Sequence, residues 1–100
     1  MKTPKVFDVV TIVWEDAQTH ATVQYDSPVA AVAAYKPCLR RSIGMWVGWA
    51  RKDGRRVALI ATDDDRGEES PEAIGGISQI PRGMIVAIEP VAKPPARRRR

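Results

Sequence analysis

The segment 43–62, IGMWVGWARKDGRRVALIAT, constrains the fold more than any other part of the chain. Its first eight residues alternate from one side chain to the next with the period of two expected of a β-strand. Asp53-Gly54 follows, and this dipeptide accepts the positive φ angles of a type I′ turn. The apolar run VALIA then suits a second, buried strand. We therefore expect a β-hairpin with strands at 40–50 and 55–62.

A two-residue loop also fixes which residues of the hairpin face each other. The expected pairs are Lys52–Arg55, Ala50–Val57, Trp49–Ala58 and Val47–Ile60. This register sets large side chains opposite small ones, as close packing requires. Trp46 and Trp49 are three residues apart, so a regular strand would place them on opposite sides. One is expected in the core, and the other exposed or at a subunit interface.

Length and composition indicate one soluble domain. A chain of 100 residues, 44% of them hydrophobic, can bury roughly 60–65% of its unfolded surface in a single core. No apolar run reaches the length of a membrane span, and the first residues, MKTPKVFD, lack a signal-peptide hydrophobic region. The single Cys38 is typical of a reducing compartment. We expect a soluble, intracellular protein with no membrane partner.

The basic charge of the chain is concentrated at its end. The sequence has 16 basic and 12 acidic side chains. Four of the basic ones are Arg97, Arg98, Arg99 and Arg100, so the other residues carry twelve of each sign and are neutral in sum. The arginine tail is either a non-specific phosphate-binding segment or a solubilising end. The domain itself shows no overall excess of basic charge of the kind found in dedicated nucleic-acid binders.

The remaining elements are short strands separated by turn residues. Residues 27–36 favour a helix capped by Ser27 with Pro28 at its first position; alternatively 23–25 is a brief strand before a shorter helix. The expected strands besides the hairpin are 6–15, 77–80 and 84–89, with a polar segment at 16–22, an acidic loop at 63–73 and a turn at 81–83. The fold class is therefore mainly β, a small closed or nearly closed barrel of about five strands with at most one short helix. The order of these elements resembles that of a small SH3-like or Sm-like barrel. It spans 6–91, between a frayed 1–5 and a disordered basic tail at 92–100.

Two segments resemble the signature motifs of Sm-like proteins. Residues 44–60 resemble the first motif, a glycine-bearing strand that turns into an apolar strand, and 80–90, IPRGMIVAIEP, resemble the second. In Sm-like proteins these two turns line a ring and hold RNA bases, which would place Asp53-Gly54 and Arg82-Gly83 at such turns. The sequence departs from the family because 52–55 lacks the usual asparagine and Pro81 precedes Arg82.

The chain also resembles small proteins encoded by tailed bacteriophages. Three short motifs carry this resemblance, and together they span about three-quarters of the sequence. They are the Trp-x-Asp-Ala segment at 14–17, the Val-Gly hairpin strand at 47–48 (or Ile-Gly at 43–44), and the Ile-Pro-x-Gly turn at 80–83. The resemblance implies a phage-encoded protein, expected in the cytoplasm of the bacterial host cell, and no particular activity.

The residue types give little support to catalysis or metal binding. His20 and Cys38 are the only residues of their kinds, and a zinc site needs three or four such ligands. The carboxylates of the acidic loop lack the spacing of a calcium-binding loop, so a solvated acidic loop is the better interpretation. We expect a protein that is not an enzyme, with no catalytic residues, no metal and no cofactor.

The hairpin tip is the best candidate for a binding site. Lys52 opposite Arg55 and Arg51 opposite Arg56 set like charges side by side, which an anionic ligand or salt bridges to the acidic loop would relieve. An exposed tryptophan beside arginines also suits stacking on a base while phosphate is held. The predicted ligand-binding residues are Trp46, Trp49, Arg51, Arg55, Arg56 and Arg82.

Three functions follow from these patterns. The leading hypothesis is a non-catalytic, homo-oligomeric binding protein for a nucleic acid or nucleotide-type ligand, with subunits joined by edge-strand pairing. The first alternative is an inhibitor or adaptor that binds a host protein through the hairpin edge or the acidic loop. The second is a structural component of the virion, for which the basic tail is the only indication.

Overall fold

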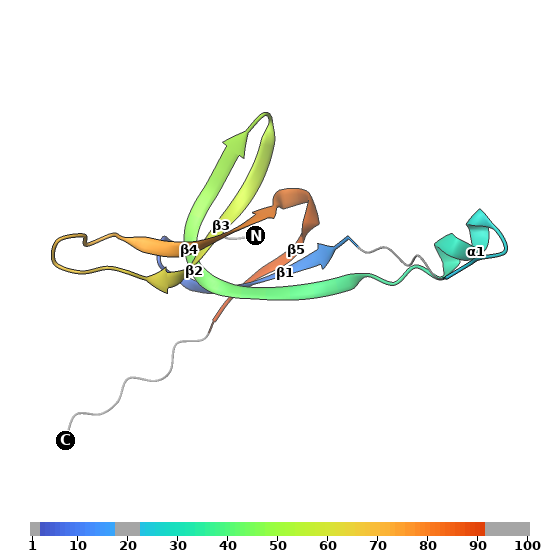
Figure 1. The fold of residues 1–100 in the computed structure, drawn as a ribbon, viewed down its shortest axis with the longest axis horizontal. Helices are drawn as coiled ribbons and strands as arrows, with labels where there is room; N and C mark the ends of the chain where they lie inside the picture. The colour runs from blue at the N-terminus through green and yellow to red at the C-terminus, as the bar shows by residue number, and fades with distance from the viewer. Residues whose placement is uncertain (1–2, 18–22, 92–100) are drawn as a thin grey trace, which may run out of the picture.

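The structure, a computed structural model, describes residues 3–17 and 23–91. Five antiparallel strands form one sheet in the order β4-β3-β2-β1-β5 (Figure 1). The elements are β1 (Val9–Asp16), α1 (Pro28–Ala33), β2 (Cys38–Lys52), β3 (Arg55–Asp64), β4 (Ile74–Pro81), the 3-10 turn η1 (Arg82–Met84) and β5 (Ile85–Pro90). The prediction of a mainly β fold of about five strands with at most one short helix is confirmed.

The sheet is not closed into a barrel, so that part of the prediction is wrong. β4 pairs only with β3 and β5 only with β1, which leaves both as edge strands. Each ends in a proline, Pro81 in β4 and Pro90 in β5. Proline lacks the N–H needed for a ladder hydrogen bond and is typical of strands that stay at an edge. The long β2 connects the two halves of the sheet, because its first half pairs with β1 and its second half with β3.

The hairpin of β2 and β3 forms as expected at its tip. Asp53 has a φ of 53° and Gly54 a φ of 76°, the two positive values that a type I′ turn needs. The pairs Lys52–Arg55, Ala50–Val57 and Trp49–Ala58 are all present. These pairs confirm the predicted register next to the turn.

The register changes further along the hairpin, at Val47. Gly48 pairs with Leu59, but Trp46 pairs with Ile60, so Val47 is an extra residue in β2. Such a bulge moves each side chain beyond it to the face opposite the one that a regular strand would give. The expected pair Val47–Ile60 is therefore wrong. Trp46 and Trp49 face the same side of the sheet rather than opposite sides, with ring centroids 5.3 Å apart in an edge-to-face arrangement.

The main buried cluster lies on this side of the sheet, called here the inner face, whereas Val13 and Ala61 are buried on the other side. Its buried cluster is Val10, Ile12, Trp46, Ala58, Ile60 and Ile80, with Trp14, Trp49, Ile85 and Ile88 packed against it. The apolar neighbours of Val10 and Ile12 in β1, Val9 and Val13, point to the opposite, outer face, since adjacent residues of a strand alternate. The blurred alternation of β1 thus comes from apolar residues on both faces.

The helix and the loops differ in extent from the sequence-based expectation. α1 is shorter than 27–36, although Ser27 caps it as predicted by accepting a hydrogen bond from the Ala30 N–H at 3.1 Å. Gly75-Gly76 lie inside β4 rather than before it. β3 extends through Asp64 into the expected acidic loop. The basic tail lies outside the described residues.

Candidate functional site

Three elements bring a tryptophan and two arginines together on the inner face. The guanidinium carbon of Arg56 in β3 lies 4.7 Å from the centroid of the Trp49 ring in β2. That of Arg82 in η1 lies 5.8 Å from the same ring. The register explains the first contact, because Trp49 is opposite Ala58 and Arg56 is the next residue of β3 on that face. We call these three residues the Trp49 cluster.

A small hollow lies beside the Trp49 cluster. It has a volume of about 150 Å³ and is lined by the cluster together with Thr3, Pro4 and Ile88. One edge of Trp49 is fixed against the buried Trp46, so its position is held by the core. A ring supported in this way presents a preorganised surface for cationic side chains and for a ligand.

The arginines of this region have no carboxylate partner among the described residues. The ion pairs found there are Arg40–Asp16 at 3.3 Å and Arg66–Asp64 at 2.7 Å. Hydrogen bonds from the side chain and backbone of Arg66 lower the pKa of Asp64 to about 2. The acidic loop lies at a different end of the molecule from the hairpin tip (Figure 1). It does not neutralise the tip, which removes the internal alternative weighed from the sequence.

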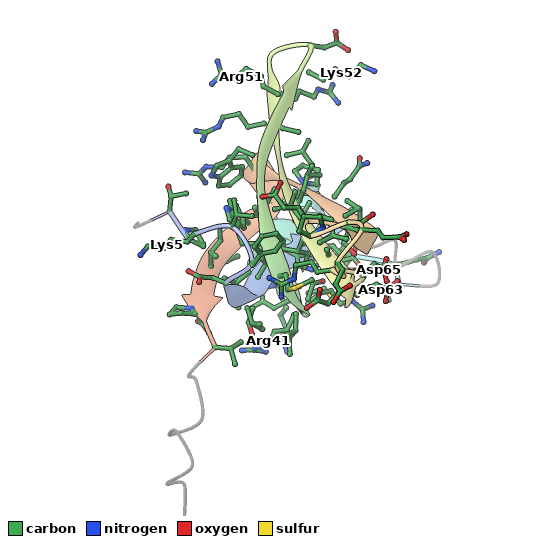
Figure 2. The ribbon with its side chains drawn as sticks, turned by 90° about the vertical axis from the view of Figure 1, so that its left-hand side faces the viewer. Lys5, Arg41, Arg51, Lys52, Asp63 and Asp65 are labelled. Atoms are coloured by element: carbon green, nitrogen blue, oxygen red, sulfur yellow. The ribbon has the colours of Figure 1, made fainter. Side chains whose placement is uncertain are left out.

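Both like-charge pairs of the hairpin tip are therefore present, and they lie on opposite faces of the hairpin. Arg51 pairs with Arg56 on the side of the Trp49 cluster, and Lys52 pairs with Arg55 on the other side. Figure 2 shows Arg51 and Lys52 near the free end of the hairpin. Arg55 borders a shallow hollow on the outer face with Val57 and Leu59. The predicted set of arginines thus belongs to two surfaces instead of one.

Trp46 has no part in ligand stacking, because only 2% of its surface is exposed. Its role is in the core. Trp49 is partly exposed, but Arg56 already lies over its ring. The stacking surface offered to a ligand is therefore the guanidinium plane together with the uncovered part of the ring, rather than a bare indole.

The sequence did not reveal the residues that complete the hollow. Thr3 and Pro4 belong to the segment expected to be frayed, and Ile88 looks like any other core residue of a strand. Only long-range pairing of β1 with β5 brings Ile88 to this place. The arginine tail and His20 lie outside the described residues. Within residues 3–17 and 23–91, no group of three or more histidine, cysteine, aspartate or glutamate side chains could hold a metal ion.

Comparison with known proteins gives no relatives. No protein-family model, no curated protein and no solved structure matches the chain. The resemblances to Sm-like proteins and to tailed-phage proteins therefore stay predictions. The described part of the chain also contains no helix with the length and apolar character needed to cross a bilayer.

Proposed function

We propose that the protein is a non-catalytic binding protein for single-stranded nucleic acid or a nucleotide, and that the Trp49 cluster is the centre of its site. One observation supports this most directly. Two guanidinium groups lie over one tryptophan ring, and neither forms an ion pair with a carboxylate of the described residues. Like charges gathered without a counterion favour an anionic ligand.

The geometry suits the two parts of a nucleotide. A guanidinium that rests on an aromatic ring keeps its N–H edge free, and this edge can donate two hydrogen bonds to phosphate oxygens. Its outer plane can stack on a base, as arginine does in single-strand binding proteins. Arg51, on the same face, extends the positive surface towards the hairpin tip.

Salt dependence measures how many phosphates the site neutralises. For single strands, the slope of log affinity against log salt concentration is about −0.7 for each phosphate contact. Contacts from Arg51, Arg56 and Arg82 therefore give a slope of about −2. A protein with no anion site would show a slope near zero.

The test measures binding of a fluorescently labelled, short single-stranded oligonucleotide by anisotropy over a range of salt concentrations. Arg56→Ala and Arg82→Ala should weaken binding and each reduce the salt slope by roughly one contact's share. Arg41→Ala and Arg55→Ala remove the same charge from the outer face. These control variants should bind like the wild type apart from a small long-range charge effect.

Two results would contradict the proposal. One is the absence of salt-sensitive binding of the oligonucleotide, and of a labelled nucleoside triphosphate, by nucleic-acid-free protein. The other is an equal loss of affinity in the Arg41 and Arg56 variants, which would mean that binding depends on net charge and not on the Trp49 cluster.

A further inference from the structure

The end of the β2–β3 hairpin stands clear of the rest of the sheet. The ladder of β3 with β4 reaches no further than Val57, and the ladder of β2 with β1 ends at Met45. Residues 51–56 therefore pair with no other strand, and all of them are exposed. Figure 1 shows this two-stranded segment projecting beyond the other strands. We call residues 51–56 the free ribbon.

The free ribbon carries basic side chains on both of its faces. Arg51 lies on the inner face, whereas Lys52 and Arg55 lie on the outer face. Figure 2 shows Arg51 and Lys52 directed to opposite sides of the hairpin end. The ion pairs among the described residues are formed by Arg40 and Arg66, so the three basic groups of the ribbon have no carboxylate partner there. A partner that neutralises all three must present negative charge to two opposite sides of the ribbon.

The dimensions of the free ribbon match the major groove of B-form DNA. An antiparallel strand rises about 3.4 Å per residue, so residues 51–53 extend about 10 Å beyond Ala50. A sheet with side chains on both faces is about 10 Å thick, because stacked sheets pack at that distance. The major groove is about 12 Å wide and about 8.5 Å deep, and it admits a two-stranded β-ribbon. Inserted end first, the ribbon reaches the floor of the groove and turns one face towards each phosphate backbone.

Other anionic partners fit the free ribbon less well. A lipid headgroup layer or an acidic protein surface would contact one face and leave the basic groups of the other face unpaired. The major groove of an RNA duplex is too deep and narrow for side chains to read, and a single strand has no groove with two walls. Double-stranded DNA is the partner that meets both faces at once.

The turn at the end of the ribbon is compatible with the floor of the groove. Asp53 lies at this end, with the φ of 53° that the type I′ turn needs. Phosphates would repel its carboxylate, but the groove floor presents the amino groups of cytosine and adenine, which donate hydrogen bonds. Insertion end first therefore places the carboxylate near donors and the basic side chains near phosphates.

We propose that the free ribbon inserts into the major groove of double-stranded DNA, with Arg51 on one phosphate backbone and Lys52 and Arg55 on the other. The inference goes beyond the proposed function, because Lys52 and Arg55 take no part in the Trp49 cluster and the partner is a duplex. Arg56, the remaining basic residue of the ribbon, rests on Trp49 and stays with that cluster.

The test measures binding of a labelled B-form DNA duplex by anisotropy over a range of salt concentrations, beginning at low salt. Contacts from Arg51, Lys52 and Arg55 give a slope of log affinity against log salt concentration of about −2.7. Lys52→Ala with Arg55→Ala should make this slope shallower by about 1.8, since each lost contact removes about 0.9. The matched control is Lys36→Ala with Arg41→Ala, which removes one lysine and one arginine outside the ribbon. It should keep the slope of the wild type, and circular dichroism checks that both variants are folded.

Modified duplexes identify the groove that the ribbon enters. The C5 position of pyrimidines faces the major groove, so a DNA duplex with bulky C5 substituents should bind much more weakly than the unmodified one. An RNA duplex of the same sequence should also bind more weakly, and a dye that occupies the minor groove of the DNA should not compete. The modified DNA and the RNA carry the same number of phosphates as the unmodified DNA, so a difference in affinity reports the groove and not the charge.

The same variants separate this inference from the proposed function. Arg82→Ala should weaken binding of the single-stranded oligonucleotide and leave binding of the duplex unchanged, whereas Lys52→Ala with Arg55→Ala should do the reverse. The inference is overturned by equal affinity for the DNA and RNA duplexes, by an equal loss in the two double variants, or by competition from the minor-groove dye. Binding of anionic lipid vesicles that depends on Lys52 and Arg55, without binding of the duplex, would also overturn it. Failure of single-strand binding alone would contradict the proposed function and not this inference.

Discussion

At the scale of single residues, Gly44 shows how closely the two halves of the sheet approach. It lies opposite Val10 on the inner face. A Cβ atom at this position would lie 2.8 Å from the Ala61 carbonyl oxygen and 3.2 Å from the Ile60 Cβ. The backbone of β3 would have to move to admit it.

Gly44→Ala should therefore destabilise the fold by about 1–3 kcal/mol, the usual cost of overpacking a well-packed core. Urea denaturation followed by tryptophan fluorescence measures this change. Gly83→Ala is the control, because a methyl group added there would meet no atom within 4 Å. Equal stability of the two variants would show that β2 and β3 are not in close contact at Gly44.

At the scale of elements, the bulge at Val47 decides which residues meet in the candidate site. Gly48 follows the extra residue and has a φ of 151°, a conformation that side-chain-bearing residues rarely adopt. Gly48→Ala has free space for its methyl group, so its cost should be conformational and amount to about 1–3 kcal/mol. The control is the neighbouring Val47→Ala, which places an alanine in the bulge but leaves Gly48 free to adopt its positive φ.

The fluorescence of Trp49 gives a second readout of the bulge. If Gly48→Ala shifts the hairpin towards a regular register, Trp49 leaves the side of Trp46 and its emission moves to longer wavelength. Unchanged stability and unchanged emission would contradict the role given to Gly48. Loss of oligonucleotide affinity in the same variant would connect the bulge to the Trp49 cluster.

The register of the hairpin can be predicted from the sequence only as far as the bulge. The Asp53-Gly54 turn could be predicted because its signal is local, and the register next to it followed directly. Gly48 is a local signal, because a glycine inside a strand pattern is typical of a bulge, but Gly44 gives the same signal in a regular part of β2, and the alternation of 43–50 is unbroken. The cause of the bulge is non-local: β2 must bend to pair with β1 along one half and with β3 along the other. A one-residue slip changes the face of every following side chain.

For the candidate site, the sequence predicts which residues take part but not the face or the burial of each. Residue type and proximity to turns predict Trp49, Arg56 and Arg82, and the fold brings these three residues together. Arg55 lies on the other face and Trp46 in the core, because the bulge decides the face of each side chain and the core decides its burial. Pairing of β1 with β5, which no local pattern indicates, supplies Ile88.

At the scale of the whole molecule, stability is unevenly distributed between the centre of the sheet and its extensions. The buried side chains lie on β1 to β4, and α1 contributes none. Regions with few buried apolar contacts open at low free energy, whereas core strands open only with global unfolding. Amide hydrogen exchange should therefore be slow at Ile12, Trp46 and Ile60 and fast throughout α1 in dilute protein.

Equal protection in α1 and in the core strands would contradict this distribution. It would mean that packing within the chain stabilises the short helix as strongly as the buried cluster stabilises β1, β2 and β3.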